Sequence, residues 1–393
     1  MAHSTPVRRR KVRGGGIWYR RATVGTIAFL QGRLPRRAVV GALALLALGA
    51  LAQVPERHPG RDKLVAAAVR EGTVSIYSTM DSAEAAPLIA EFEALYPGIR
   101  VQYSEMNSPE VYGRFLSETE AEGSSADLTW SSAMDLQLKL ANDGYAQAYR
   151  SPQAGHLPDW AVWHDEAYGT TFEPAVFVYN RKLVPADEVP HTHTEFAQLL
   201  KAKRSKYMGN VITYDIEKSA VGFLFLSQDS LLMPGFWDFV GTLGTLNVEL
   251  EANTAVMMER IASGKDLIGY NLIGSYALGR AKRDPSLGIV LPRDYTLVLS
   301  RVILIAKKAR HPSAAKLWLD FVLSRRGQAV LAEKSRLFSI RPDVEGEFTA
   351  ASLSATLGAS ARPIAVGPGM LVFLDKAKHA ELVKRWRKAL APN

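Results

Sequence analysis

The 393-residue chain contains no cysteine. Without thiols it has no disulfides, no thiolate nucleophile and no Cys-ligated metal. The common catalytic and nucleotide-binding motifs are missing as well. Gly264-Lys265 lacks the upstream glycine and the following Ser or Thr of a P-loop, and no G-x-S-x-G, H-E-x-x-H or strand-linked G-x-G-x-x-G pattern occurs. These absences argue against the best-known classes of hydrolase, metalloprotease and nucleotide-binding protein.

A surplus of positive charge is absent from most of the chain. The formal net charge is +9, but residues 1–52 hold ten Lys or Arg and no Asp or Glu. Subtracting those ten leaves a net charge of −1 for the remainder. A nucleic-acid-binding domain needs a clustered basic face, so we expect no nucleic-acid partner.

The N-terminal apolar run is short. It extends from Ala38 to Ala52, below the about 20 residues that span a bilayer. Arg33, Arg36 and Arg37 precede it, and it ends in the small-residue pattern Ala50-Leu51-Ala52. This arrangement predicts a signal peptide over about 33–52 and a periplasmic location. An uncleaved anchor is the alternative, and no cysteine follows the run to carry a lipid.

Strand-like and helix-like segments alternate through the remaining 340 or so residues, which suffice for two domains. This rhythm predicts an α/β fold with mixed, mainly parallel sheets and helices on both faces. The predicted strands cover 73–77, 99–103, 127–130, 210–214 and 266–270. The predicted helices cover 82–96, 108–121, 133–143, 193–203, 219–242, 253–263, 312–331 and 376–390.

Two long β-rich stretches, 170–179 and 295–305, interrupt this rhythm. We interpret them as strands that cross between two lobes. The predicted division is an N-terminal extension with the signal peptide (1–52), a first lobe (53–177), an inserted second lobe (178–297), and a return to the first lobe with the C-terminal helices (298–393).

Polar clusters follow four of the predicted strands. In open α/β sheets, ligands bind beyond the carboxyl ends of strands, where helix N-termini favour anions. Each Ser or Thr in such a place is also an ordinary N-cap candidate. We predict that the clusters converge on one cleft. They lie at 78–82, 131–132, 213–219 and 270–276.

Several segments together resemble the extracellular solute-binding proteins of ABC importers, in the branch that holds ferric-iron, sugar-phosphate, phosphonate and phosphoglycerate binders. The resemblance spans most of 73–390 and implies the type-2 periplasmic binding protein fold: two lobes, a two-strand hinge and a ligand enclosed on closure. It rests on 74–81, 91–98, 127–132, 171–180, 309–315, 320–324 and Gly327-Gln328.

The resemblance also implies which residues face the ligand. They are Ser78, Thr79, Ser131, Ser132, Glu173, Thr213, Tyr214, Asp215, Ser219, Tyr270, Asn271, Ser275 and Tyr276. Arg301 in the second crossing strand is either a bidentate anion clamp or the partner of a structural carboxylate. No cofactor is expected.

The chain departs from the ferric binders of this branch, which use adjacent tyrosines. Five residues lie between Tyr270 and Tyr276, and no two tyrosines are adjacent anywhere in the chain. Hydroxyl, amide and carboxyl groups better suit a hydroxylated organic anion. Glu173 and Asp215 would accept hydrogen bonds from its hydroxyl or amine groups.

The predicted function is delivery of a small phosphorylated or carboxylated compound to an ABC permease of the inner membrane by a monomeric periplasmic protein. A ferric-iron binder and a periplasmic sensor for a membrane histidine kinase are alternatives with the same fold. A secreted enzyme using Asp215, Glu217 or Glu173 is a third, but no paired-carboxylate spacing supports it.

Overall fold

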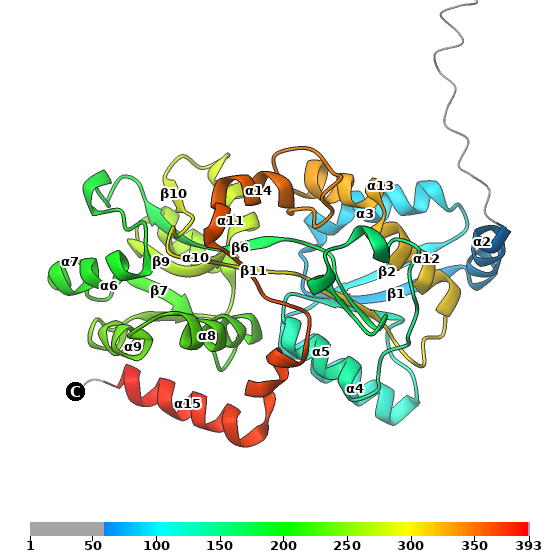
Figure 1. Ribbon diagram of the computed structural model, residues 1–393, viewed down its shortest axis with the longest axis horizontal. Helices are drawn as coiled ribbons and strands as arrows, with labels where there is room; N and C mark the ends of the chain where they lie inside the picture. The colour runs from blue at the N-terminus through cyan, green and yellow to red at the C-terminus, as the bar shows by residue number, and fades with distance from the viewer. Residues whose placement is uncertain (1–58, 392–393) are drawn as a thin grey trace, which may run out of the picture. The chain divides into compact units, whose positions relative to one another are not determined.

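The computed structural model describes residues 59–391, and the predicted signal peptide lies outside that range. The described residues form two α/β lobes, each built on one mixed sheet (Figure 1). Within this range no helix has the length and apolar character needed to cross a membrane.

The first lobe has a six-stranded sheet in the order β2-β1-β3-β12-β5-β4. Strand β1 pairs in parallel with β2 and β3, whereas β12 runs antiparallel to β3. The strands are β1 (Thr73–Ser78), β2 (Arg100–Glu105), β3 (Leu128–Ser131), β4 (Val162–Trp163), β5 (Ala167–Gly169) and β12 (Val302–Ile305). The helices are α2 (Pro59–Glu71), α3 (Ser82–Leu95), α4 (Ser108–Glu122), α5 (Met134–Asn142), α12 (Pro312–Leu323) and α13 (Arg325–Val330).

Alternation along β1 explains why helices cover both faces of this sheet. Val74 and Ile76 join the apolar cluster that contains Trp318 of α12, while Tyr77 joins the cluster that contains Phe115 of α4. Successive side chains of a strand point to opposite faces. Both faces of the strand are therefore covered.

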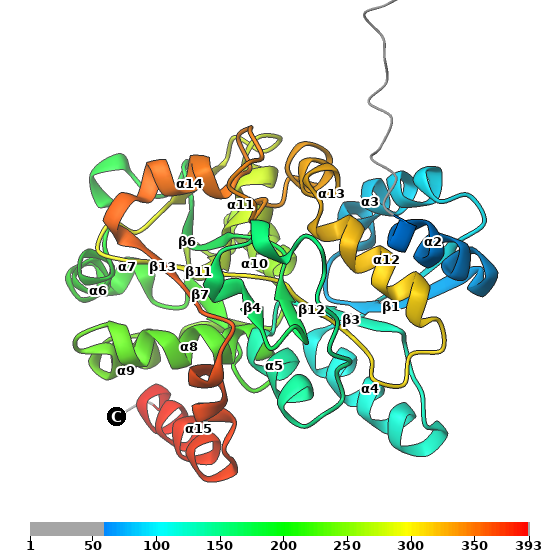
Figure 2. The ribbon, with the colours of Figure 1, turned by 45° about the vertical axis from the view of Figure 1, so that its right-hand side comes forward.

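The second lobe has a sheet in the order β13-β11-β6-β9-β7-β8, and β10 pairs with β6. Figure 2 labels β13, β11, β6 and β7 of this sheet. Its strands are β6 (Glu173–Asn180), β7 (Val211–Tyr214), β8 (Glu249–Glu251), β9 (Ile268–Ile273), β10 (Leu287–Val290), β11 (Thr296–Leu299) and β13 (Ala361–Pro363). Its helices are α6 (His193–Ala202), α7 (Arg204–Tyr207), α8 (Ala220–Leu232), α9 (Phe236–Thr245), α10 (Thr254–Ser263), α11 (Gly274–Ala281), α14 (Ala350–Leu357) and α15 (Lys376–Leu390).

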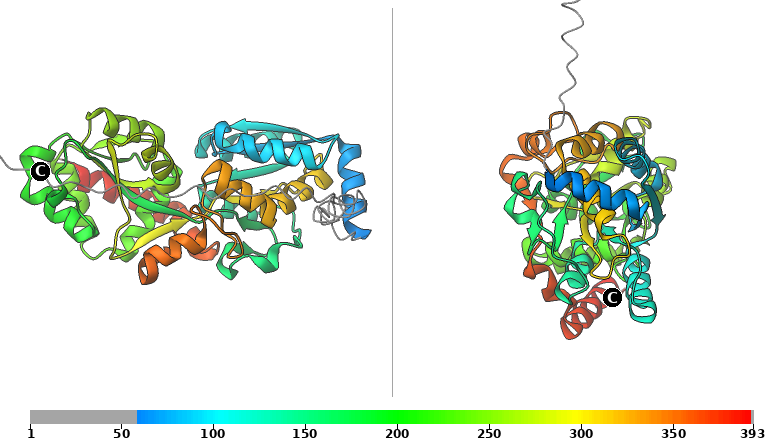
Figure 3. Two further views of the ribbon diagram at one scale, coloured as in Figure 1. Left: turned by 90° about the horizontal axis from the view of Figure 1, so that it is seen from above. Right: turned by 90° about the vertical axis from the view of Figure 1, so that its right-hand side faces the viewer.

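Two crossing strands join the lobes, as the view from above shows (Figure 3). One runs from β5 into β6, and the other from β11 into β12. The chain passes between the lobes a third time, from α13 to α14. The predicted strand 295–305 is broken at Ser300 and Arg301, because Thr171 forms side-chain bonds there. Its Oγ1 accepts from the Arg301 N–H at 2.8 Å, and its N–H donates to Ser300 Oγ at 3.2 Å. Two α/β lobes joined by two crossing strands are the arrangement that the resemblance predicts.

Two further segments differ from the predicted ones. The predicted helix 312–331 is interrupted at Ser324, whose extended backbone and side chain cap the start of α13. The C-terminal part, which the predicted boundaries group with the first lobe, pairs with the second sheet through β13 and packs α15 on α9. The lobe boundaries themselves stay a prediction.

Candidate functional site

A cavity of about 320 Å³ lies between the two lobes. Each of the four predicted polar clusters contributes at least one residue to its wall. Five of the predicted site residues line it: Thr79, Ser132, Ser219, Tyr276 and Arg301. Polar residues that are not among the predicted site residues also line it: Asp81, Glu105, Asn107, Ser108, Lys218, Asn253 and Thr254.

Three helices begin at the wall of this cavity. The N-cap residues of α4, α8 and α10 are Asn107, Ser219 and Asn253, and each side chain accepts a hydrogen bond from its own helix. For Ser219 the N-cap interpretation is therefore confirmed, and the same residue also lines the cavity. The aligned peptide dipoles make the N-terminal ends of these helices positive. The cavity thus receives positive potential from three directions.

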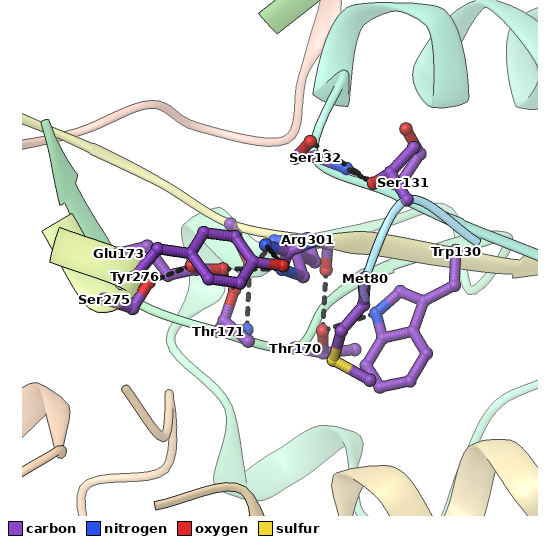
Figure 4. Close-up of polar contacts among 12 residues, drawn as sticks. Met80, Trp130, Ser131, Ser132, Thr170, Thr171, Glu173, Ser275, Tyr276 and Arg301 are labelled. Atoms are coloured by element: carbon purple, nitrogen blue, oxygen red, sulfur yellow. Dashed lines mark hydrogen bonds and ion pairs between the residues drawn. The ribbon is translucent and has the colours of Figure 1, made fainter. Parts of the chain in front are cut away.

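Arg301 is 1% exposed and is held from two sides (Figure 4). Its Nε donates to Glu173 Oε1 at 2.9 Å, and its Nη2 donates to the Tyr276 hydroxyl at 2.9 Å. Burial acts to lower the pKa of Arg301, but the charge of Glu173 outweighs it and holds that pKa above its usual range. The third guanidinium nitrogen, Nη1, is buried and has no partner within the described residues. Arg301 is thus paired with a structural carboxylate, lines the cavity and keeps one buried nitrogen without a partner among the described residues.

Tyr276 connects the two lobes. Its ring lies 5.2 Å from the Arg301 guanidinium carbon, and its hydroxyl donates to Asp81 Oδ1 at 3.3 Å. Asp81 precedes α3 of the first lobe, whereas Tyr276 is on α11 of the second. Burial raises the pKa of Tyr276, so the group stays a neutral phenol and a donor. Burial likewise raises the pKa of Asp81.

The turns of the first lobe are shaped by their own hydroxyl groups. Thr79 Oγ1 accepts from the Ser132 N–H at 2.9 Å, which ties the turn after β1 to the turn after β3. Ser78 and Ser131 are buried, and each Oγ accepts from the backbone N–H two residues ahead at 3.1 Å. Such local bonds stabilise turns. Ser78 and Ser131 therefore position the wall without being part of it.

Tyr270 and Asn271 lie in the interior of the second lobe. The Tyr270 hydroxyl donates to the Asp229 carboxylate at 2.8 Å, and the Asn271 side-chain amide donates to it at 2.5 Å. The Tyr295 hydroxyl donates to the same carboxylate at 2.7 Å. The predicted strand ended at Tyr270, but β9 continues to Ile273. The three extra residues move the turn onward, so Tyr276 reaches the cavity in place of Tyr270.

The other predicted residues also have partners inside the protein. Thr213 donates to the Tyr270 carbonyl, and Tyr214 shares a hydrogen bond with Thr254. Asp215 accepts from the Glu217 N–H and pairs with Lys218 at 3.0 Å. Ser275 donates to Glu173 within the buried hinge. A ligand-contacting role for the fourteen residues stays a prediction.

The sequence is similar to known transport proteins. The family model for bacterial extracellular solute-binding proteins matches residues 87–356. A substrate-binding protein of an ABC transporter from Agrobacterium tumefaciens is 40% identical, with a TM-score of 0.77 over 81% of this chain and 94% of that chain. A comparison with the curated proteins gives no match.

Two more distant structures share the fold. The periplasmic binding protein AfuA from Actinobacillus pleuropneumoniae, with fructose-6-phosphate bound, is 18% identical, with a TM-score of 0.68 over 81% of this chain and 98% of that chain. Iron-bound HitA from Pseudomonas aeruginosa is 16% identical, with a TM-score of 0.63 over 81% of this chain and 99% of that chain.

Proposed function

The chain belongs to the bacterial extracellular solute-binding proteins of ABC transporters, and from this premise we propose that its cavity binds a small organic compound with a phosphoryl or carboxyl group. Proteins of this family bind small ligands outside the cytoplasm and work with a membrane permease. We further propose that this protein is a periplasmic monomer whose segment 33–52 is removed on export.

The unpartnered nitrogen of Arg301 is the observation that carries the choice of ligand. A buried guanidinium N–H without an acceptor is costly, and a charged acceptor makes the strongest bond to it. An anionic oxygen of the ligand would supply that acceptor. The three helix N-termini at the wall favour the same charge.

Tyr276 weighs against ferric iron as the ligand. It is the one tyrosine among the described residues that line the cavity, and burial raises its pKa above the usual range. A metal ligand must be deprotonated, so burial opposes the phenolate that iron would need. Relatives of this fold include an iron-bound and a sugar-phosphate-bound protein, and the wall of this cavity supports the organic anion.

Ligand binding is expected to stabilise the protein against unfolding. A ligand at 100 times its dissociation constant adds about 2.7 kcal/mol to the free energy of unfolding. Thermal shift with sugar phosphates, phosphonates, glycerates and ferric iron measures this, and native mass spectrometry identifies any co-purified compound. Stabilisation by ferric iron alone would overturn the proposal.

Replacement of Tyr276 by phenylalanine is expected to weaken binding of the compound found in that screen by about threefold to tenfold. The change removes the hydroxyl that joins Arg301 to Asp81 across the lobes. A ligand that bridges two lobes binds the closed form better, and loss of this contact favours the open form. Calorimetry gives the affinity, and X-ray scattering gives the lobe separation.

The matched control for this change is Tyr103→Phe. The Tyr103 hydroxyl donates to the Met80 carbonyl inside the first lobe, so its loss removes a hydrogen bond without touching the second lobe. An equal loss of affinity in both variants would show that Tyr276 does not act through the lobes.

A further inference from the structure

A second cavity, of about 410 Å³, adjoins the first. We call it the side chamber. The two cavities share Asp81, Ala255 and Tyr276 as a common wall. The first lobe contributes the start of α3 and the residues around the π-helix Leu331–Ser335, and the second lobe contributes α10 and α11.

Two buried polar atoms of the side chamber have no hydrogen-bond partner within the described residues. They are Oε2 of Glu84 and Oγ of Ser335. Ser335 is 5% exposed, so water reaches it poorly. An unmade hydrogen bond at a buried group carries its full desolvation cost. Burial, followed by the charge of Asp81, raises the pKa of Glu84. Each of these unpaired atoms therefore lowers the stability of the folded protein unless a hydrogen-bond donor binds to it.

The acidic and basic side chains of the side chamber differ in how deeply they are buried. Asp81 and Glu84 are partly buried, whereas Arg283, Lys334 and Arg336 are exposed at the rim. The remaining cation, Arg280, pairs with Glu259. Exposed charges are screened by water and salt, so the inner wall is effectively acidic. A group that enters is met by carboxylate oxygens.

The inner wall lies close to the proposed anion position. Arg301 Nη2 donates to the Tyr276 hydroxyl at 2.9 Å, and this hydroxyl donates to Asp81 at 3.3 Å. Asp81 lines both cavities, so the Tyr276 hydroxyl bridges the guanidinium of the first cavity and a carboxylate of the side chamber.

We propose that the side chamber receives a protonated amine of the same solute whose anionic group binds at Arg301, so that the solute is a zwitterion. The ammonium group donates to Glu84 Oε2 and Ser335 Oγ, the two atoms that lack partners. This inference rests on the proposed anion-binding function and narrows its ligand class. It makes Glu84 the residue that selects amine-bearing anions over plain ones.

The test compares matched pairs of anions that differ by one amine. Phosphoethanolamine is paired with ethyl phosphate, and β-alanine with propionate, and each is titrated by calorimetry into the full protein. The wild type is expected to bind the amine-bearing member at least about tenfold more tightly. Glu84→Gln is expected to lose at least about tenfold for that member and to leave the plain anion unchanged.

Glu333→Gln is the matched control, because Glu333 lines the same chamber but is exposed at its rim. It is expected to keep the preference for the amine. Should Glu84→Gln fail to fold, Ser335→Ala is expected to lose about threefold for amine-bearing anions alone.

Two outcomes would overturn the inference, and they are distinguishable. Equal affinity for both members of each pair, or an equal loss for both in Glu84→Gln, would mean that the side chamber holds water and the anion site stands. Failure of every anion in these pairs and in the thermal screen to bind would overturn the proposed function, and this inference with it.

Discussion

Replacement of Arg301 by methionine is expected to destabilise the folded protein by about 3–5 kcal/mol and to abolish anion binding. Glu173 is fully buried and has the Arg301 guanidinium at 2.9 Å. Removing the cation leaves a buried carboxylate whose other partners are the neutral hydroxyls of Thr171 and Ser275. Urea unfolding measures the stability, and thermal shift with the ligand measures the binding.

A double-mutant cycle separates the two effects. Glu173→Leu is expected to lower the free energy of unfolding by a similar amount, because the buried Arg301 then has no carboxylate partner. The double variant, Arg301→Met with Glu173→Leu, is expected to recover part of the stability, since no buried charge remains unpaired. It is not expected to recover binding. Additive losses of stability would show that the pair is not coupled, and restored binding would remove Arg301 from the proposed site.

The family and the fold were predictable because their signals are local. The apolar alternation at β1, the Pro-Gly after α3 and the alternating strand and helix lengths each depend on neighbouring residues. The crossing segments were recognisable for the same reason, since each is an unusually long β-rich run. The structure confirms the two-lobed fold with its two-strand hinge.

The wall of the cavity was predictable at the level of turns and less so at the level of side chains. The predicted strand ended too early, at Tyr270, because a polar pair in mid-strand resembles a strand end, whereas Asp229 accepts hydrogen bonds from both side chains inside the lobe. That carboxylate is 41 residues away from Tyr270 in the chain. No local sequence pattern predicts a hydrogen-bond partner that is so far away in the chain.

Some omitted wall residues did have a local signal. Asn107 is followed three positions later by Glu110, and the two form a capping box at the start of α4. This pattern marks a helix N-terminus from sequence alone, and a helix N-terminus beyond a strand of this sheet is a candidate wall position. The pairing of Arg301 with Glu173 had no such signal, because 128 residues separate the two in the chain.

Asp135 is expected to make the stability of the protein depend strongly on pH. It lines a separate cavity of about 540 Å³. Residues of α5 in the first lobe, α8 in the second and α15 at the C-terminus line it. Asp135 is 3% exposed, and its Oδ1 accepts a hydrogen bond from the Leu136 N–H at 2.9 Å. Burial raises the pKa of Asp135 from 3.8 to about 7. The folded protein therefore holds this proton through much of the range in which an unfolded chain releases it.

The sign of the pH dependence follows from that proton. Between pH 4 and pH 7 the folded state binds more protons at Asp135 than the unfolded state, so the free energy of unfolding falls as the pH rises. The pKa values of 3.8 and about 7 set the total change at about 4 kcal/mol. Asp135→Asn is expected to remove this fall and to be the more stable protein at pH 8.

Urea unfolding at pH 4 to pH 8 measures this difference, and Asp238→Asn is the matched control. Asp238 also lies in the first turn of its helix, α9, but it is exposed, so its replacement is expected to leave the slope with pH unchanged. A wild-type slope that persists in Asp135→Asn would assign the titration to another group.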